Sequence, residues 1–315
     1  EPLQRMGAKV ELQGERGCAP IRITGGRLTG IDYVLPVASA QVKSCVLLAG
    51  LFAEGATVVT EPEATRDHTE ALLRAMGVKV ETDGPRIRLQ GFGAGGPALT
   101  PGHWTVPGDF SSAAYWIVAA ACREGAELVI EGVGLNPRRT ALLDVLRRMG
   151  ADIQVRDQKA QIAADGSVWE RLGTIVVKGR KVRGTEVGGA EIPILIDEVP
   201  ILAAAAALAD GQTVIRDAAE LSVKESDRIA TVATGLQAMG VRVEVRRDGM
   251  VVTGAPKIKG GVSLDSFDDH RVAMAMSVLA LSADAPVIIA KTWCVATSYP
   301  DFWKHLSLIT GQRVE

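Results

Sequence analysis

One sequence pattern occurs four times along the chain and limits the folds that it can adopt. The copies begin at Ser39, Ser111, Asp197 and Asp268. In each copy, a polar cluster opens an alanine-rich apolar segment of helical length, a turn and a β-rich run follow, and a polar turn leads into an amphipathic segment. Helices that alternate with strands in this way form layers of helices against sheets. The repeat therefore predicts an α/β fold made of similar units.

The two helical segments of each copy differ in how their apolar residues are distributed. The first is apolar nearly all round, as in "VPILAAAAALA", and is predicted to be buried. The second has one apolar stripe and is predicted to cover a sheet at the surface. In the first three copies this second helix ends in Met-Gly, and Gly77, Gly150 and Gly240 suit the left-handed conformation that often follows a last helical turn.

A break in the repeat indicates a domain boundary. Residues 103–112, "HWTVPGDFSS", interrupt the pattern with a proline and a glycine that are typical of turns. A chain of 315 residues is expected to form about two domains. We therefore expect one lobe at residues 1–106 and a second at residues 107–315. The irregular segment at residues 179–193 is expected to join repeats inside the second lobe.

The composition excludes several classes of protein. The net charge of −2 provides no global positive field for nucleic acid. The four cysteines are scattered without CxxC or metal-ligand spacing, so reduced thiols in a cytoplasmic setting are expected. The apolar runs are too short to span a membrane. We expect no signal peptide before Glu1, and because the first residue is not methionine we expect a processed protein or a piece of a longer one.

Motifs of other chemistries are absent or unconvincing. The sequence contains no P-loop, HExxH or GxSxG motif. The glycine-rich "GFGAGG" at residues 91–96 resembles a dinucleotide-binding fingerprint, but "PALTPG" follows it where a helix would have to begin. We therefore do not expect it to bind a dinucleotide.

Charged clusters stand where the second helix of three copies begins: "TRDHTE", "NPRRT" and "KESDR". A helix N-terminus presents free N–H groups and the positive end of the helix dipole, and a nearby Lys or Arg makes it a site for phosphate or carboxylate. The alternative is a solvated, capped helix start with local ion pairs. Both interpretations remain open for any one cluster.

The first helices of the copies also begin with polar residues. For Ser39, Ser111 and Ser112 capping of the helix is the simpler interpretation. Asp197 lies between "PILI" and "VPILAAAAALA", where partial burial would raise the pKa of its carboxyl and suit a general base, although capping is equally plausible. In "DDHR", residues 268–271, His270 is expected to be structural.

Taken together, these clusters resemble a known family. The stretches "LPVASAQVKSCVLLAGL", "TRDHTE", "VPGDFSSAA", "GVGLNPRRT", "LIDEVPILA", "VKESDRI", "DDHRVAMA" and "TSYPDFWKHL" are similar to 5-enolpyruvylshikimate-3-phosphate synthase, in order, from residue 1 to about 313. The related enolpyruvyl transferase that acts on UDP-N-acetylglucosamine shares the fold, but "SAQ", "IDE" and "KESDR" fit it poorly.

The resemblance implies a two-lobed α/β enolpyruvyl transferase fold built from repeated βαβαββ-type units, with the first lobe incomplete. It implies transfer of the enolpyruvyl group of phosphoenolpyruvate to the 5-hydroxyl of shikimate 3-phosphate, with release of phosphate, in the shikimate pathway. No metal or organic cofactor is implied. The partners implied are the two small-molecule substrates, and neither nucleic acid nor a membrane.

The resemblance also implies roles for individual residues. Asp197 matches the acid that takes the proton of the 5-hydroxyl, and Glu225 is the candidate to deliver a proton to the methylene carbon of phosphoenolpyruvate. Asp227 is expected to cap its helix or to form an ion pair. The residues implied to bind shikimate 3-phosphate are Ser39, Ala40, Gln41, Arg66, Asp197 and Lys224, and those for phosphoenolpyruvate are Gln41, Arg228 and Arg271.

The chain departs from the family pattern in two places. Family members extend further at the N-terminus, and that part carries a Lys-Ser pair, an arginine and a glycine-containing loop that contact the substrates. A lysine near the C-terminus of some members is replaced by Thr297. The alternatives left open are a fragment that binds shikimate 3-phosphate without turnover, with the N-terminal segment as a partner in trans, and the UDP-N-acetylglucosamine transferase.

Overall fold

The computed structural model describes residues 1–163 and 165–311, so residues 164 and 312–315 of the expected second lobe lie outside the description. No helix in this described part is long and apolar enough to cross a membrane. Nor do its His, Cys, Asp and Glu side chains form a group of three or more that could hold a metal ion. All four cysteines are free thiols.

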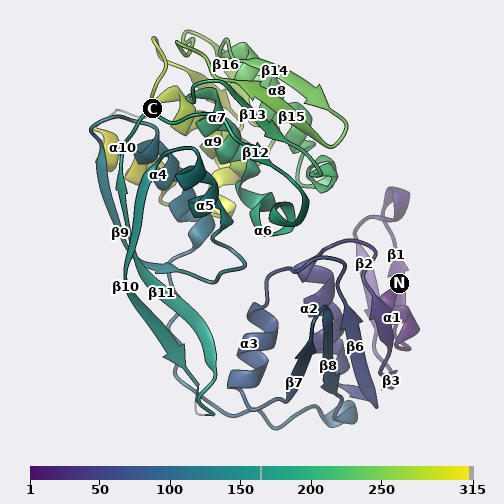
Figure 1. Cartoon of the computed structure of the whole chain (residues 1–315). Helices are drawn as coiled ribbons and strands as arrows, with labels where there is room; N and C mark the ends of the chain where they lie inside the picture. The colour runs from purple at the N-terminus through teal and green to yellow at the C-terminus, as the bar shows by residue number, and fades with distance from the viewer. Residues whose placement is uncertain (164, 312–315) are drawn as a thin grey trace. The chain divides into compact units, whose positions relative to one another are not determined.

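The chain divides into two compact units (Figure 1). The first unit comprises residues 1–106 and 160–171. The second comprises residues 107–159 and the chain from residue 172 onward. The short segment 160–171, which the sequence placed in the second lobe, thus groups with the first unit. That the first lobe binds shikimate 3-phosphate, and that the second carries the catalytic acids and the arginines for phosphoenolpyruvate, stays a prediction.

The first unit is built on a four-stranded sheet with one buried face. The strand order is β4-β6-β8-β7, in which β4 and β6 are parallel and the other neighbours antiparallel. Alternate residues of β6 and β8, among them Val59, Ile87 and Leu89, are buried against α2 and α3. The elements are β4 (Asp32–Val34), α2 (Ala40–Gly50), β6 (Ala56–Thr60), α3 (His68–Ala75), β7 (Val80–Asp83) and β8 (Arg86–Gln90).

Shorter elements complete the first unit. They form one antiparallel hairpin, β1 with β2, and one short parallel pair, β3 with β5. These elements are α1 (Pro2–Arg5), β1 (Lys9–Leu12), η1 (Glu15–Gly17), β2 (Ile21–Thr24), β3 (Leu28–Thr29), β5 (Ala53–Glu54) and η2 (Gly93–Gly95). The 3₁₀ turn η2 occupies the "GFGAGG" loop, and no α-helix follows it before residue 110, so this loop lacks the helix that a dinucleotide site requires.

The segment 160–171 is the tip of a long hairpin formed by β10 (Asp152–Ile162) and β11 (Val168–Lys178). The ring of Trp169 meets that of Trp104 edge-on, with centroids 5.3 Å apart. Gln161 Nε2 donates a hydrogen bond of 2.8 Å to the backbone oxygen of Thr105. These contacts hold the tip in the first unit.

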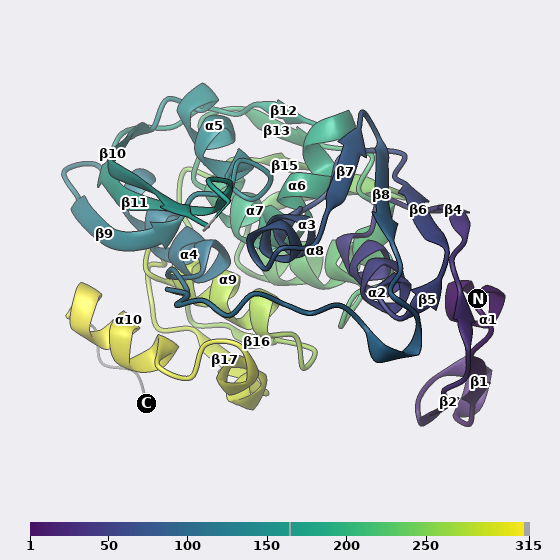
Figure 2. The same ribbon diagram turned by 90° about the horizontal axis from the view of Figure 1, so that it is seen from below.

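The second unit has three buried helices at its centre: α4 (Phe110–Ala121), α7 (Val199–Ala207) and α9 (His270–Ala280). They lie side by side (Figure 2), and each packs against a different sheet: α4 on β9, α7 on β15 and α9 on β17. The sheets have the orders β10-β11-β9, β12-β13-β15-β14 and β16-β17. The copies that begin at Ser111, Asp197 and Asp268 each provide one central helix, so the repeat predicted from the sequence is present in the tertiary structure.

The remaining elements of the second unit are the strands of these sheets and the outer helices. They are β9 (Glu127–Gly134), α5 (Ala141–Arg148), β12 (Glu186–Val187), η3 (Gly189–Glu191), α6 (Ile192–Leu195), η4 (Ile196–Glu198), β13 (Gln212–Ile215), η5 (Ala219–Val223), α8 (Arg228–Ala238), β14 (Arg242–Arg246), β15 (Gly249–Thr253), β16 (Ser263–Asp265), β17 (Ile288–Ala290), η6 (Thr292–Thr297) and α10 (Phe302–Thr310).

The predicted helix ends are confirmed. Helices α3, α5 and α8 end one residue before a methionine that is followed by glycine. Gly77, Gly150 and Gly240 have φ values of +88°, +103° and +81°. Only glycine adopts this region without a steric penalty, so the Met-Gly pairs mark where each helix stops.

Candidate functional site

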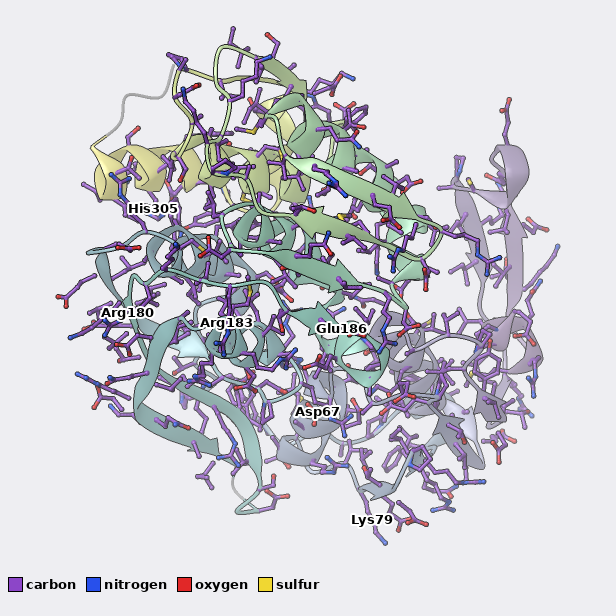
Figure 3. The ribbon with its side chains drawn as sticks, turned by 45° about the horizontal axis from the view of Figure 1, so that its top comes forward. Asp67, Lys79, Arg180, Arg183, Glu186 and His305 are labelled. Carbon is purple, nitrogen blue, oxygen red and sulfur yellow. The ribbon has the colours of Figure 1, made fainter. Side chains whose placement is uncertain are left out.

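A pocket in the first unit collects three of the residues expected to bind ligand. It has a volume of about 180 Å³ and is lined by Ala40, Gln41, Ser44, Arg66, His68 and Thr69. It lies where α2 and α3 begin, and Asp67, labelled in Figure 3, is the residue just before α3. Sequence reasoning missed Ser44, His68 and Thr69, although all three stand in the clusters "SAQVKS" and "TRDHTE".

Ser39 has the capping role that the sequence suggested. Its Oγ accepts a hydrogen bond of 3.3 Å from the backbone N–H of Val42, so it caps α2. Ser39 does not line the pocket, whereas its neighbours Ala40 and Gln41 do. A contact between Ser39 and shikimate 3-phosphate stays a prediction.

A buried cation lies in the same helix as Gln41. The side chain of Lys43 is 0% exposed, and its Nζ is 3.0 Å from Glu61 Oε2 and 2.7 Å from Glu70 Oε1. Glu61 Oε2 also accepts hydrogen bonds from the backbone N–H and the hydroxyl of Thr65, the residue before Arg66. The Lys43 ammonium therefore ties α2 to the end of β6 and to α3, the elements that form the pocket.

In the second unit, Asp197 lies in the 3₁₀ turn η4, between α6 and α7. Its side chain is 12% exposed, and Oδ2 is 3.2 Å from Arg139 Nη1. Its backbone oxygen accepts a hydrogen bond of 2.9 Å from Arg271 Nη1. The N-cap of α7 is Glu198, with no side-chain capping bond, so Asp197 does not cap this helix. The structure thus favours the interpretation of Asp197 as a partly desolvated acid over the capping alternative.

The expected capping by Ser111 and Ser112 is wrong. Helix α4 begins at Phe110, so the cap falls one residue earlier, on Asp109, whose Oδ2 accepts a hydrogen bond of 2.8 Å from the N–H of Ser112. The Ser111 hydroxyl instead donates to Glu198 Oε1 and accepts from Arg139 Nη2. Ser111 is therefore part of the polar network around Asp197.

The residues of the "KESDR" cluster provide one helix cap and three ion pairs. Asp227 accepts hydrogen bonds of 3.1 Å from the N–H groups of Ile229 and Ala230, so of its two expected roles, helix cap or ion pair, the structure shows the cap. Lys224 pairs with Glu220. Glu225 is half-exposed, at 51%, and its Oε2 is 2.5 Å from Arg228 Nη2.

Arg228 is enclosed rather than presented to solvent. Its side chain is 1% exposed, and Nε donates a hydrogen bond of 2.8 Å to Asp269 Oδ2. Asp269 Oδ1 also accepts from the N–H of Arg271 at 2.9 Å. Burial pushes the pKa of Asp269 up, but the hydrogen bond and charge of Arg228 outweigh it, so the pKa is lowered overall. Asp269 therefore joins the "KESDR" cluster to the start of α9.

These contacts place four of the expected residues of the second unit in one network. Glu225 contacts Arg228, Arg228 contacts Asp269, and Asp269 caps the helix from which Arg271 reaches Asp197. Lys224 pairs with Glu220, which lies outside this network. Sequence reasoning missed Arg139, Glu198 and Asp269, although the motifs "NPRRT", "IDE" and "DDHR" contain them.

Comparison with known proteins identifies the family. A sequence model described as "EPSP synthase (3-phosphoshikimate 1-carboxyvinyltransferase)" matches residues 1–306. The chain is 49% identical over 308 residues to the 3-phosphoshikimate 1-carboxyvinyltransferase of Chloroflexus aggregans, covering 98% of this chain and 69% of that protein. It is 44% identical over 310 residues to that of Bacillus subtilis, covering 98% and 70%.

Comparison with solved structures supports the same family. The EPSP synthase of Acinetobacter baumannii superimposes with a TM-score of 0.82 at 46% identity, over 98% of this chain and 68% of that one. The enolpyruvyl transferase NikO of Streptomyces tendae has a TM-score of 0.77 at 21% identity, over 98% and 69%, which shows the shared fold. The expected enolpyruvyl transferase fold and the resemblance drawn from the motifs are both confirmed: the chain belongs to the EPSP synthase family.

Proposed function

We propose that this protein transfers the enolpyruvyl group of phosphoenolpyruvate to the 5-hydroxyl of shikimate 3-phosphate and releases phosphate. This is the step of the shikimate pathway, toward aromatic amino acids, that the family name describes. The observation that carries the proposal is the family match over residues 1–306, with identities of 44–49% to proteins named for this reaction. The protein is then a transferase and an enzyme of amino-acid biosynthesis.

In this proposal, the pocket of the first unit binds shikimate 3-phosphate. Arg66 provides a positive charge for the phosphate, and Gln41 provides an amide that can donate to either substrate. Ser39 and Ala40 shape the start of α2 beside them. Both substrates are polyanions, so a pocket at two helix starts with an arginine in its wall suits their chemistry.

The network of the second unit then carries the proton transfers. Addition across the enol double bond requires one group that removes the proton of the 5-hydroxyl and another that gives a proton to the methylene carbon. We assign the first role to Asp197 and the second to Glu225. Arg271 and Arg228 provide charge for phosphoenolpyruvate, and Lys224 for shikimate 3-phosphate.

The proposal needs no metal or organic cofactor, because proton transfer and charge stabilisation by side chains account for each step. The partners are the two small-molecule substrates. With a net charge of −2 the chain has no general positive field for nucleic acid, and we place the reaction in the cytoplasm.

The test of the proposed function is release of phosphate from the purified protein with both substrates present. Each substrate alone is the control, and mass spectrometry identifies the enolpyruvyl product. We expect phosphate and product in equal amounts only when both substrates are supplied. Calorimetric binding of shikimate 3-phosphate without any release of phosphate would point to a binding protein. Turnover of UDP-N-acetylglucosamine instead would point to the related transferase.

The role of Arg66 leads to a separate prediction. Replacing Arg66 by Ala removes a charge-assisted contact, so binding of shikimate 3-phosphate should weaken by about 1.5–3 kcal/mol, or about 10- to 150-fold in Kd. Calorimetry measures the affinity. Arg88→Ala is the matched control, because Arg88 pairs with Glu81 on the strands of the same unit and does not line the pocket. Equal affinities for Arg66→Ala and the unmodified protein would contradict the binding role of Arg66. The cluster "TRDHTE" would then be a solvated helix start that binds no ligand.

A further inference from the structure

A second carboxyl lies directly beside Asp197. Glu198 is 1% exposed, and its Oε1 accepts a hydrogen bond from the Ser111 hydroxyl. Its Oε2 is buried and has no hydrogen-bond partner among residues 1–163 and 165–311. A buried polar oxygen without a hydrogen bond costs folding free energy. A buried Glu198 next to the proposed general base therefore calls for a reason beyond packing.

The guanidinium of Arg139 connects the two acids. Its Nη1 is 3.2 Å from Asp197 Oδ2, and its Nη2 is 3.7 Å from Glu198 Oε1. Nη2 also donates to the Ser111 hydroxyl, which donates in turn to Glu198. Because a guanidinium is planar, holding Nη2 at Ser111 and Glu198 fixes the direction in which Nη1 meets Asp197.

Arg271 approaches the same two acids from α9. Its Nη1 is 2.9 Å from the backbone oxygen of Asp197 and 3.8 Å from Glu198 Oε1. Its Nη2 is 3.9 Å from Asp197 Oδ2. Each arginine is therefore shared between Asp197 and Glu198, so two positive groups face two carboxyls.

Charge balance at Asp197 depends on this sharing. With Glu198 ionised, the two cations are divided between two carboxylates. Without that charge both cations act more strongly on Asp197, which would stabilise its ionised form and make it a weaker base. Burial raises the pKa of Glu198 above its ordinary value; Arg139 and Arg271 offset this only in part, and the charge of Asp197 adds to the increase.

Other charged or titratable groups also face these acids and arginines. From α4 and its cap come Tyr115 and Asp109, whose Oδ1 is 3.7 Å from Arg139 Nη2. Arg228 and Asp269, at the starts of α8 and α9, act on Tyr115. Asp109 pairs with Arg139, whereas Glu198 lies within 4 Å of both Arg139 and Arg271, so Glu198 is the acid that shares both cations with Asp197.

We propose that Glu198 and Arg139 are positioning residues for the proposed reaction, which share positive charge with Asp197 so that its carboxylate stays oriented and basic. This inference rests on the proposed function, in which Asp197 is the general base. Neither residue needs to touch a substrate. They act through Asp197 and through Arg271.

The discriminating variant is Glu198→Gln, which keeps the shape and can still accept from Ser111 but carries no charge. We expect kcat to fall about 10-fold, because a weaker base transfers the proton less readily. We also expect the acidic limb of the pH profile of kcat to move to lower pH by about one unit. The sign follows from the removal of a negative charge, since Asp197 then stays ionised to lower pH.

The matched control is Glu191→Gln. Glu191 lies seven residues before Glu198 in the chain and pairs with Arg148, outside the network around Asp197. The pH profile of this variant should not move. Arg139→Lys keeps the charge but cannot bridge two acids, so it should lower kcat with little change in the KM for either substrate. A merely structural role for Glu198 would lower the thermal stability of Glu198→Gln and leave the acidic limb in place, which would overturn the proposal.

A second measurement is independent of turnover. The carboxyl carbon of Asp197, assigned in a ¹³C NMR spectrum by its loss in Asp197→Asn, can be titrated directly. We expect its titration midpoint to lie lower in Glu198→Gln than in the unmodified protein. If the titration midpoint of Asp197 is the same in Glu198→Gln and in the unmodified protein, Glu198 does not share charge with Asp197, and the proposal is overturned even if the protein is active. A lowered midpoint in a protein that releases no phosphate would instead reject the proposed function and keep the charge sharing.

Discussion

Replacing Asp197 by Asn should lower kcat by about 10²–10⁴-fold, the span of a general acid–base group, while the protein stays folded. Asn keeps the shape of the side chain and an oxygen that can accept from Arg139, but it cannot take the proton of the 5-hydroxyl. The KM for each substrate should change much less than kcat, since the lost interaction belongs to the transition state. Steady-state measurement of phosphate release tests this.

Two controls make the result for Asp197 specific. Asp144→Asn changes an exposed acid of α5 and should leave kcat unaltered. Thermal melts of both variants report on folding. If Asp197→Asn loses stability but keeps its kcat, Asp197 is a structural acid held between two arginines. The base would then have to be sought elsewhere, with Glu225 as the next candidate.

The second large effect is expected in stability. Lys43→Met should lower the free energy of unfolding of the first unit by about 3–5 kcal/mol, because it removes the buried ammonium that pairs with the carboxylates of Glu61 and Glu70. Methionine fills a similar volume, so a cavity does not explain the loss. Urea denaturation followed by fluorescence measures it, with Trp104 and Trp169 as reporters in this unit.

The controls for Lys43 use both an exposed lysine and the acids themselves. Lys79→Met removes an exposed lysine of the same unit and should change the stability by less than about 0.5 kcal/mol. Adding Glu61→Gln and Glu70→Gln to Lys43→Met should recover part of the loss, since the buried charges are then removed together. A cost below about 1 kcal/mol for Lys43→Met alone would mean that the two acids are neutral or solvated in the folded protein.

Local features of the structure could be predicted from the sequence. The repeat predicted the central helices, and the Met-Gly pairs predicted where α3, α5 and α8 end. For Asp227 the sequence suggested a cap or an ion pair, and the cap is present. All of these depend on hydrogen bonds and side-chain spacing within a few residues along the chain, which is the information that periodicity and capping preferences contain.

The candidate site was predicted only in part. Ala40, Gln41 and Arg66 do line one pocket, and Arg271 does contact Asp197. The partners of these residues were not foreseen. Lys43 stands in a helix that reads as mostly apolar, and nothing next to it in the sequence indicates that Glu61 and Glu70 would neutralise it.

The sequence by itself therefore determined the α/β repeat, the helix ends, the family and most of the residue types that carry charge to the site. Tertiary structure alone decided which charges meet: Arg139 with Asp197 across 58 positions, Arg228 with Asp269 across 41, and the hairpin tip at residues 160–171 with the first unit. The physical reason is that an ion pair is made by whichever groups the folded backbone brings within about 4 Å, and its strength depends on burial. Neither distance nor burial is a property of neighbouring residues in the chain.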